Sequence, residues 1–245
     1  MNISEMKSKN DVTTGAVQHV DFGLRQYMLK VFNYMSAGLV LTGLVAYLFA
    51  SNRFLLGLLY NPVTKDMTGF GWLVTFAPLI VIFVFNYVQF NKSLLTLQAI
   101  FWTFSALMGA SLSWLCSYYT GASITRVFLI AAATFTSFSL YGYTTQRNLT
   151  SLGGFMFMGL IGLIIATLVN AFMESSTLQY ALSYIGIVVF VGLTAYDTQK
   201  IKYMYYYGKD SEETTARFAV AGALSLYLDF INLFLSLLRL LGDRR

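Results

Sequence analysis

Two aspartates stand inside apolar stretches near the end of this 245-residue chain. Asp197 is the only acidic residue in residues 178–201, and Asp229 is the only carboxylate in residues 218–241. An ionised Asp at the centre of a bilayer costs at least about 2.5 kcal/mol, so both side chains should face protein or water. The chemistry to consider first is therefore the binding of protons or cations by paired carboxylates.

The depth of the two aspartates depends on where the first of these helices ends. If it ends at Ile201, Asp197 lies only about 6 Å from the end, whereas Asp229 lies about 16 Å into the next apolar stretch. If it continues through Tyr207 and stops at Gly208, Asp197 lies about 15 Å from that end. The longer helix allows antiparallel neighbours to hold the two carboxylates at similar depth.

The last helix is expected to begin before its apolar stretch. Thr214 and Thr215 are typical N-cap residues, and a start there places Asp229 about 21 Å along the helix. Glu212 and Glu213 precede them and suit the positive end of a helix dipole.

One face of the last helix is polar. The residues that share it follow one another at spacings of four, three and four: Ser225, Asp229, Asn232 and Ser236. This stripe should look into the protein.

The composition is that of an integral membrane protein. Hydrophobic residues make up 57% of the chain and charged residues 11%, against about 25% charged residues in a soluble domain. The net charge of +5 comes from Lys and Arg at the ends of spans, so it does not indicate a nucleic acid partner. The lipid bilayer is the partner that this composition requires.

The sequence lacks the cysteine and histidine residues that many common enzyme sites use. Cys116 is the only cysteine, which excludes an internal disulfide and a cysteine metal cage. His19 is the only histidine and lies in the polar tail, so a Ser-His-Asp triad is not available. We expect no enzyme and no cofactor.

Apolar stretches predict an all-α protein with seven transmembrane helices. The predicted spans are residues 28–50, 72–90, 94–118, 124–143, 152–172, 178–201 with the extension described above, and 218–241. Residues 1–24 form a polar tail, and residues 25–245 form the transmembrane domain. The apolar run 54–60 is too short to span and should lie at the membrane interface.

Small residues every four positions predict close helix packing in two spans. They are Ser105, Gly109 and Ser113 in the third span and Gly162, Ala166 and Asn170 in the fifth.

The distribution of Lys and Arg predicts the orientation. With the N-terminus inside, ten of the 16 basic residues lie on the inner side and six on the outer side. The positive-inside rule therefore favours a cytoplasmic N-terminus and a C-terminus on the opposite side.

Two longer motifs contain the aspartates: GLTAYDTQKI at residues 192–201 and LSLYLDFIN at residues 224–232. Together they resemble the Bax inhibitor-1 family, most closely its bacterial members. The resemblance implies a bundle in which the last helix is central and six others surround it. It also implies that Asp197 and Asp229 form the pH-sensing element of a calcium leak pathway in the bacterial inner membrane.

The physical chemistry of the pair agrees with that role. Two carboxylates close together in a poorly solvated site cannot both ionise cheaply, so they should share a proton. The shared proton would hold the last two helices together, and its loss would open a path. Ca²⁺ favours oxygen ligands, and Thr198, Ser225 and Asn232 can add neutral oxygens to those of the aspartates.

Some bacterial relatives hold the carboxylate with an arginine of the second span. Residues 72–90 of this chain contain no Lys or Arg. The hydrogen bond between the two aspartates is therefore the expected latch.

Two other functions compete with the leak channel. The resemblance also suggests a membrane-embedded modulator of a partner, such as a membrane protease or a stress-response complex. An intramembrane aspartyl protease would need a Gly-x-Gly-Asp sequence, which neither aspartate has.

Overall fold

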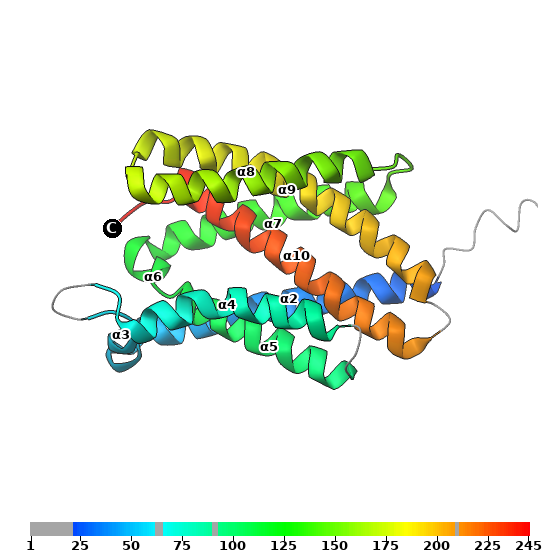
Figure 1. The fold of residues 1–245 in the computed structure, drawn as a ribbon, viewed down its shortest axis with the longest axis horizontal. Helices are drawn as coiled ribbons and strands as arrows, with labels where there is room; N and C mark the ends of the chain where they lie inside the picture. Colours follow the sequence, from blue (N-terminus) through cyan, green and yellow to red (C-terminus); the bar gives the residue numbers. More distant parts are fainter. Residues whose placement is uncertain (1–21, 62–65, 90–92, 209–210) are drawn as a thin grey trace, which may run out of the picture.

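A computed structural model describes residues 22–61, 66–89, 93–208 and 211–245 of the chain (Figure 1). Within these ranges the helices are α2 (Phe22–Ser51), α3 (Arg53–Leu59), α4 (Gly69–Val88), α5 (Leu94–Ser111), α6 (Leu115–Tyr118), α7 (Gly121–Thr144), α8 (Thr150–Met173), α9 (Ser176–Gly208) and α10 (Glu212–Leu241). Most of the predicted polar tail, residues 1–21, lies outside the described residues, and residues 22–24 already belong to α2.

The predicted fold class is confirmed. Seven helical segments are long and apolar enough to cross a membrane, with α5 and α6 together forming one of them. The first described residues and the C-terminus lie at opposite ends of the bundle (Figure 1). The chain is a multi-pass membrane protein.

The third span is interrupted, which the sequence did not predict. Between α5 and α6 the backbone hydrogen bonds join residues three apart instead of four. The N–H of Ser113 donates to the carbonyl of Ala110, and the N–H of Leu115 donates to the carbonyl of Leu112. Bonds of this i to i+3 type tighten a helix and redirect it. The short run 54–60 also forms a helix, α3, which is too short to span.

α10 is the centre of the bundle (Figure 1). It packs against α2, α5, α7 and α9, and it is the most deeply buried of the seven spans. α4 packs mainly on α5, and α8 on α9, so these two form the outer part of the bundle. The central last helix is therefore confirmed, with four neighbours in extensive direct contact. A helix apolar around most of its circumference suits this buried position.

The ends of α9 and α10 test two predictions. α9 runs to Gly208, which confirms the longer of the two helices considered. The prediction that α10 starts at Thr214 or Thr215 is wrong, because Ser211 is the N-cap and its hydroxyl accepts from the N–H of Thr214. Glu212 and Glu213 instead occupy the first turn, where their charge favours the helix dipole.

The small residues of the third span pack as predicted, whereas Gly162 of the fifth does not. A Cβ at Gly109 would collide with the carbonyl oxygen of Thr42, so α2 and α5 approach backbone to backbone there. A Cβ at Gly162 would meet no atom within 4 Å. The fifth-span prediction is wrong at this position because that side of α8 does not face another helix.

A second close approach fixes α9 against α7. A Cβ at Gly142 of α7 would collide with the backbone carbonyl of Ala195 in α9. Ala195 is two residues before Asp197, so this contact sets the position of the helix segment that carries the carboxylate.

We expect Gly142→Ala to destabilise the protein by about 1–3 kcal/mol, because the added methyl group forces two backbones apart. The measurement is the thermal unfolding midpoint in detergent. Gly154→Ala is the matched control, since a Cβ there meets nothing within 4 Å. A midpoint for Gly142→Ala equal to that of the control would contradict the close approach.

Candidate functional site

The contacts between α9 and α10 fix the level of each residue along the pair. The two helices are antiparallel neighbours and share the largest interface in the bundle. Three pairs in contact set the register: Thr215 with Gly208 through a 2.8 Å hydrogen bond, Gly222 with Ile201, and Ser236 with Gly186. From each pair to the next, a step back along α9 is matched by a nearly equal step forward along α10.

This register brings Asp197 and Asp229 to neighbouring levels. Asp197 lies opposite Ser225 and Leu226, about one turn from Asp229. The Cα–Cβ bonds of a helix tilt toward its N-terminus, so side chains on two antiparallel helices tilt in opposite directions. Each aspartate therefore leans toward the level of the other, and the two carboxylates lie close enough to interact electrostatically.

The two carboxylates differ in burial. Asp229 is 5% exposed, whereas Asp197 is half-buried. The Oδ2 atom of Asp229 is buried and has no hydrogen-bond partner among the residues that the structure describes. An unpartnered buried carboxylate oxygen is costly unless it is protonated or receives a cation.

No ion pair neutralises either aspartate within the described ranges. The recorded ion pairs are Arg126 with Asp243 and Arg217 with Glu213, both at the ends of helices. Lys200, which is exposed, acts electrostatically on Asp197 but forms no ion pair with it. The carboxylate pair therefore carries its charge, or its proton, without a fixed counter-ion.

The polar residues predicted beside the pair take different positions. Ser225 is half-buried on the level of Asp197. Asn232 donates from Nδ2 to the carbonyl of Leu228 over 2.8 Å, which leaves its Oδ1 available as a ligand. Thr198 instead faces α7, as described below.

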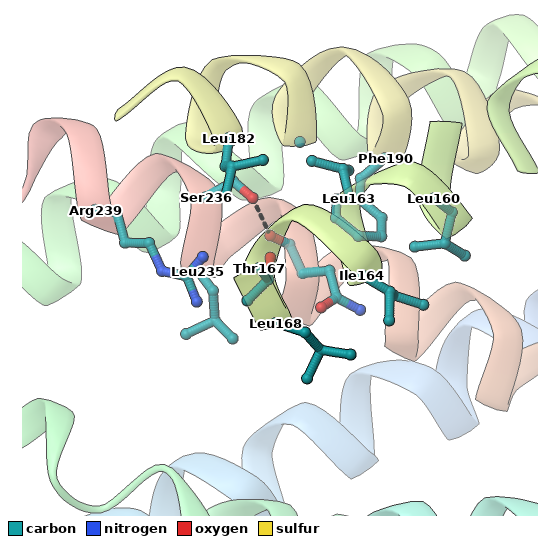
Figure 2. A pocket seen from close by; sticks show the side chains of 12 residues that line it. Leu160, Leu163, Ile164, Thr167, Leu168, Leu182, Phe190, Leu235, Ser236 and Arg239 are labelled. Atoms are coloured by element: carbon teal, nitrogen blue, oxygen red, sulfur yellow. Dashed lines mark hydrogen bonds between the residues drawn. The ribbon is translucent and has the colours of Figure 1, made fainter. Parts of the chain in front are cut away.

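A cavity of about 270 Å³ lies between α8, α9 and α10 on the C-terminal side of Asp229. Figure 2 shows Thr167, Ser236 and Arg239 around it, together with five leucines of its wall. Asn232 also lines it, and the Ser236 hydroxyl donates to the Asn232 carbonyl over 2.8 Å. The predicted polar stripe therefore leads from this cavity toward the buried carboxylate.

The comparison with known families agrees with this arrangement. The family model described as inhibitor of apoptosis-promoting Bax1 matches residues 24–245. The chain belongs to the Bax inhibitor-1 family.

Several bacterial relatives match this Bax inhibitor-1 chain over nearly its whole length. It is 49% identical to the uncharacterized protein RP147 of Rickettsia prowazekii, over 97% of this chain and 98% of the relative. It is 42% identical to the inner membrane protein YbhL of Escherichia coli K12, over 91% of this chain and 94% of the relative. An uncharacterized protein of Caulobacter vibrioides is 40% identical over 92% of each chain.

The Bax inhibitor-1 motif around Asp197 also positions the helix that carries it. The Thr198 hydroxyl donates to the carbonyl of Thr194 and lies 3.0 Å from the hydroxyl of Ser139 in α7. Gln199 accepts from the N–H of Leu149 and donates to the carbonyl of Arg147, both over 2.8 Å. Thr198 and Gln199 therefore tie α9 to α7 and to the loop that follows it.

A second polar contact, which the sequence did not reveal, ties α10 to the opposite side of the bundle. The Tyr227 hydroxyl lies 2.7 Å from that of Thr42, which in turn donates to the carbonyl of Ser105 or Gly38. Tyr227 is two residues from Asp229, so it points to another side of α10 and joins it to α2 and α5. All of these side chains are buried, and each hydroxyl is satisfied, as membrane depth requires.

Asp197 and Asp229 are the two acidic side chains at this site in the described part of the chain. Among the described residues there is no cluster of three or more His, Cys, Asp or Glu side chains. Ca²⁺ takes six to eight oxygen ligands, so neutral oxygens such as Asn232 Oδ1 would have to complete any coordination.

We expect Gln199→Ala to lower stability by about 1–3 kcal/mol, because it leaves the N–H of Leu149 and the carbonyl of Arg147 without their partner. Hydrogen exchange at Leu149 should accelerate and the thermal midpoint should fall. Gln146→Ala, an exposed glutamine in the same loop, should change neither. Equal effects of the two substitutions would contradict the positioning role of Gln199.

Proposed function

We propose that this protein is a pH-sensitive Ca²⁺ leak channel, gated by protonation of the Asp197 and Asp229 pair. The ion passes down its own gradient, and the proton is the control. Membership of the Bax inhibitor-1 family supports a membrane-embedded role of this kind.

The observation that carries the proposal is the buried Asp229 oxygen, which has no hydrogen-bond partner in the described part of the chain and lies beside a second carboxylate. Two such groups in a poorly solvated site share one proton, because ionising both is expensive. The shared proton forms a hydrogen bond between α9 and α10 and holds the path closed. When the proton leaves, repulsion separates the carboxylates and both become available to a cation.

The surroundings of the pair support a route for the ion. The cavity on the C-terminal side reaches Asn232, one turn from Asp229. A hydrated cation entering there meets the hydroxyl of Ser236, the free oxygen of Asn232 and then the carboxylates. These are oxygen ligands of the kind that Ca²⁺ prefers.

The proposed function includes a cellular location and an orientation in the membrane. The relative YbhL is named an inner membrane protein, and we assign this chain to the bacterial inner membrane as well. The excess of Lys and Arg on the N-terminal side supports a cytoplasmic N-terminus. The cavity beside Asp229 would then open toward the periplasm.

We predict that purified protein in liposomes passes Ca²⁺ at a rate that rises between pH 5 and pH 9. The rate rises with pH because the channel is closed when the aspartate pair is protonated and open when it is deprotonated. Asp197→Asn and Asp229→Asn should each remove the pH dependence, because the new amide donates a hydrogen bond to the remaining carboxylate, which then stays ionised without a repelling neighbour. The measurement is Ca²⁺ entry reported by a trapped fluorescent indicator.

The control is Glu174→Gln, which removes an exposed carboxylate at the C-terminal end of α8. It should leave both the rate and its pH dependence unchanged. Flux equal to that of empty liposomes at every pH would overturn the channel. The modulator of a membrane protein partner would then be the better hypothesis, with the aspartates acting as a packing contact.

A further inference from the structure

A second, larger cavity lies between α2 and α7, on the opposite side of the membrane from the cavity beside Asp229. Its volume is about 590 Å³, within the roughly 300–1,000 Å³ of pockets that bury a small ligand. α2 and α7 both pack against α10, which therefore lies behind the cleft. The wall is mainly apolar and includes Met28, Leu29, Phe32, Phe135, Leu140 and Tyr143.

The length of the cleft matches one leaflet of a bilayer. Along α2 it extends from Arg25 to Ser36, eleven residues or about 16 Å. The hydrocarbon core of a bilayer is about 30 Å thick, so the cleft covers about half of it. Arg25 lies in the first turn of α2, at the level of the lipid headgroups.

The rim of the cleft is positively charged. Arg25 is the only charged residue that lines it, and no ion pair of Arg25 is recorded within the described ranges. Lys202 adjoins the same rim. Its Nζ donates to the backbone carbonyl of Tyr143 over 3.0 Å and lies 5.5 Å from the centre of the Tyr143 ring. The planar guanidinium of an arginine is suited to bind a phosphate through two of its donors.

We propose that this cleft binds an anionic phospholipid, with its phosphate at Arg25 and one acyl chain along the apolar wall. The apolar lining excludes a charged or strongly hydrated occupant at depth, and the two cations at the rim favour a negative headgroup. The excess of Lys and Arg on this side indicates the cytoplasmic leaflet, where anionic lipids attract basic residues.

The bound lipid would touch the support of the aspartate motif. Ser139 lines the cleft, and its hydroxyl lies 3.0 Å from that of Thr198, the residue after Asp197. An acyl chain in the cleft therefore packs against the contact that ties α9 to α7. The lipid site does not depend on the channel proposal, since its binding can be measured without ion flux.

The test is native mass spectrometry of the full chain in detergent, titrated with palmitoyl-oleoyl phosphatidylglycerol or with the phosphatidylcholine of the same chains. The native protein should bind one phosphatidylglycerol at least about fivefold more tightly than phosphatidylcholine. Arg25→Gln should remove this preference and leave phosphatidylcholine binding unchanged. Thr136→Trp, which fills the cleft from α7, should remove the tight site for both lipids.

Two matched controls accompany these variants. Arg147→Gln removes an exposed positive charge on the same side, and Ser137→Trp adds the same bulk on a side of α7 that does not line the cleft. Both should bind as the native chain does. Equal affinities of the native chain for the two lipids, equal losses in Arg25→Gln and Arg147→Gln, or unchanged binding by Thr136→Trp would each overturn the proposal. Arg25 lies at the surface, so its variant tests the site even if Thr136→Trp fails to fold.

Discussion

The structure depends on one constraint, which is that a carboxylate is held at the centre of a membrane bundle with no counter-ion among the residues that the structure describes. Asp229 is buried in the central helix, and its only recorded electrostatic neighbour is another carboxylate, Asp197. Desolvation and repulsion both oppose a second negative charge there, and we therefore propose that the two groups share one proton. In the proposed channel, that proton is both a contact between α9 and α10 and the group that a change of pH removes.

The rest of the fold holds α9 and α10 in place around the two aspartates. Gly142 lets α7 approach α9 closely, and Gln199 ties α9 to the loop before α8. On another side of α10, the contact between Tyr227 and Thr42 joins the central helix to α2 and α5. α9 and α10 are therefore attached to different parts of the bundle, and the aspartate pair lies at the junction between them.

Much of this arrangement could be predicted from the sequence, because membrane spans are set by apolar length and buried charges are rare. The seven spans followed from hydropathy and the central last helix from the motif resemblance, whereas the sequence left two possible ends for α9, Ile201 and Gly208, of which the structure shows the second. The break after α5, the N-cap at Ser211 and the outward side of Gly162 did not follow from the sequence. The break and the N-cap depend on local hydrogen bonds, and the side of Gly162 depends on which face of α8 meets another helix. The spacing of residues within one segment specifies neither the hydrogen bonds nor the facing helix.

The positions of the site residues were predictable to different degrees. The depth of Asp197 and Asp229 followed from counting along antiparallel helices. The use of Thr198 and Gln199 as ties to α7 and its loop did not, because their partners Ser139 and Leu149 are about fifty or more residues away in the chain. The same holds for Thr42, whose contact with Tyr227 spans most of the sequence.

The most direct test of the central claim is infrared spectroscopy of the protein in lipid, which detects protonated carboxyl groups by their C=O stretch. We expect one protonated aspartate per chain at neutral pH, lost as the pH rises toward 9. This signal should be absent from both Asp197→Asn and Asp229→Asn, where an amide can donate to the remaining carboxylate. A native protein with no protonated carboxyl group at any pH in the range 5–9, or a band that persists unchanged in both variants, would contradict the shared proton.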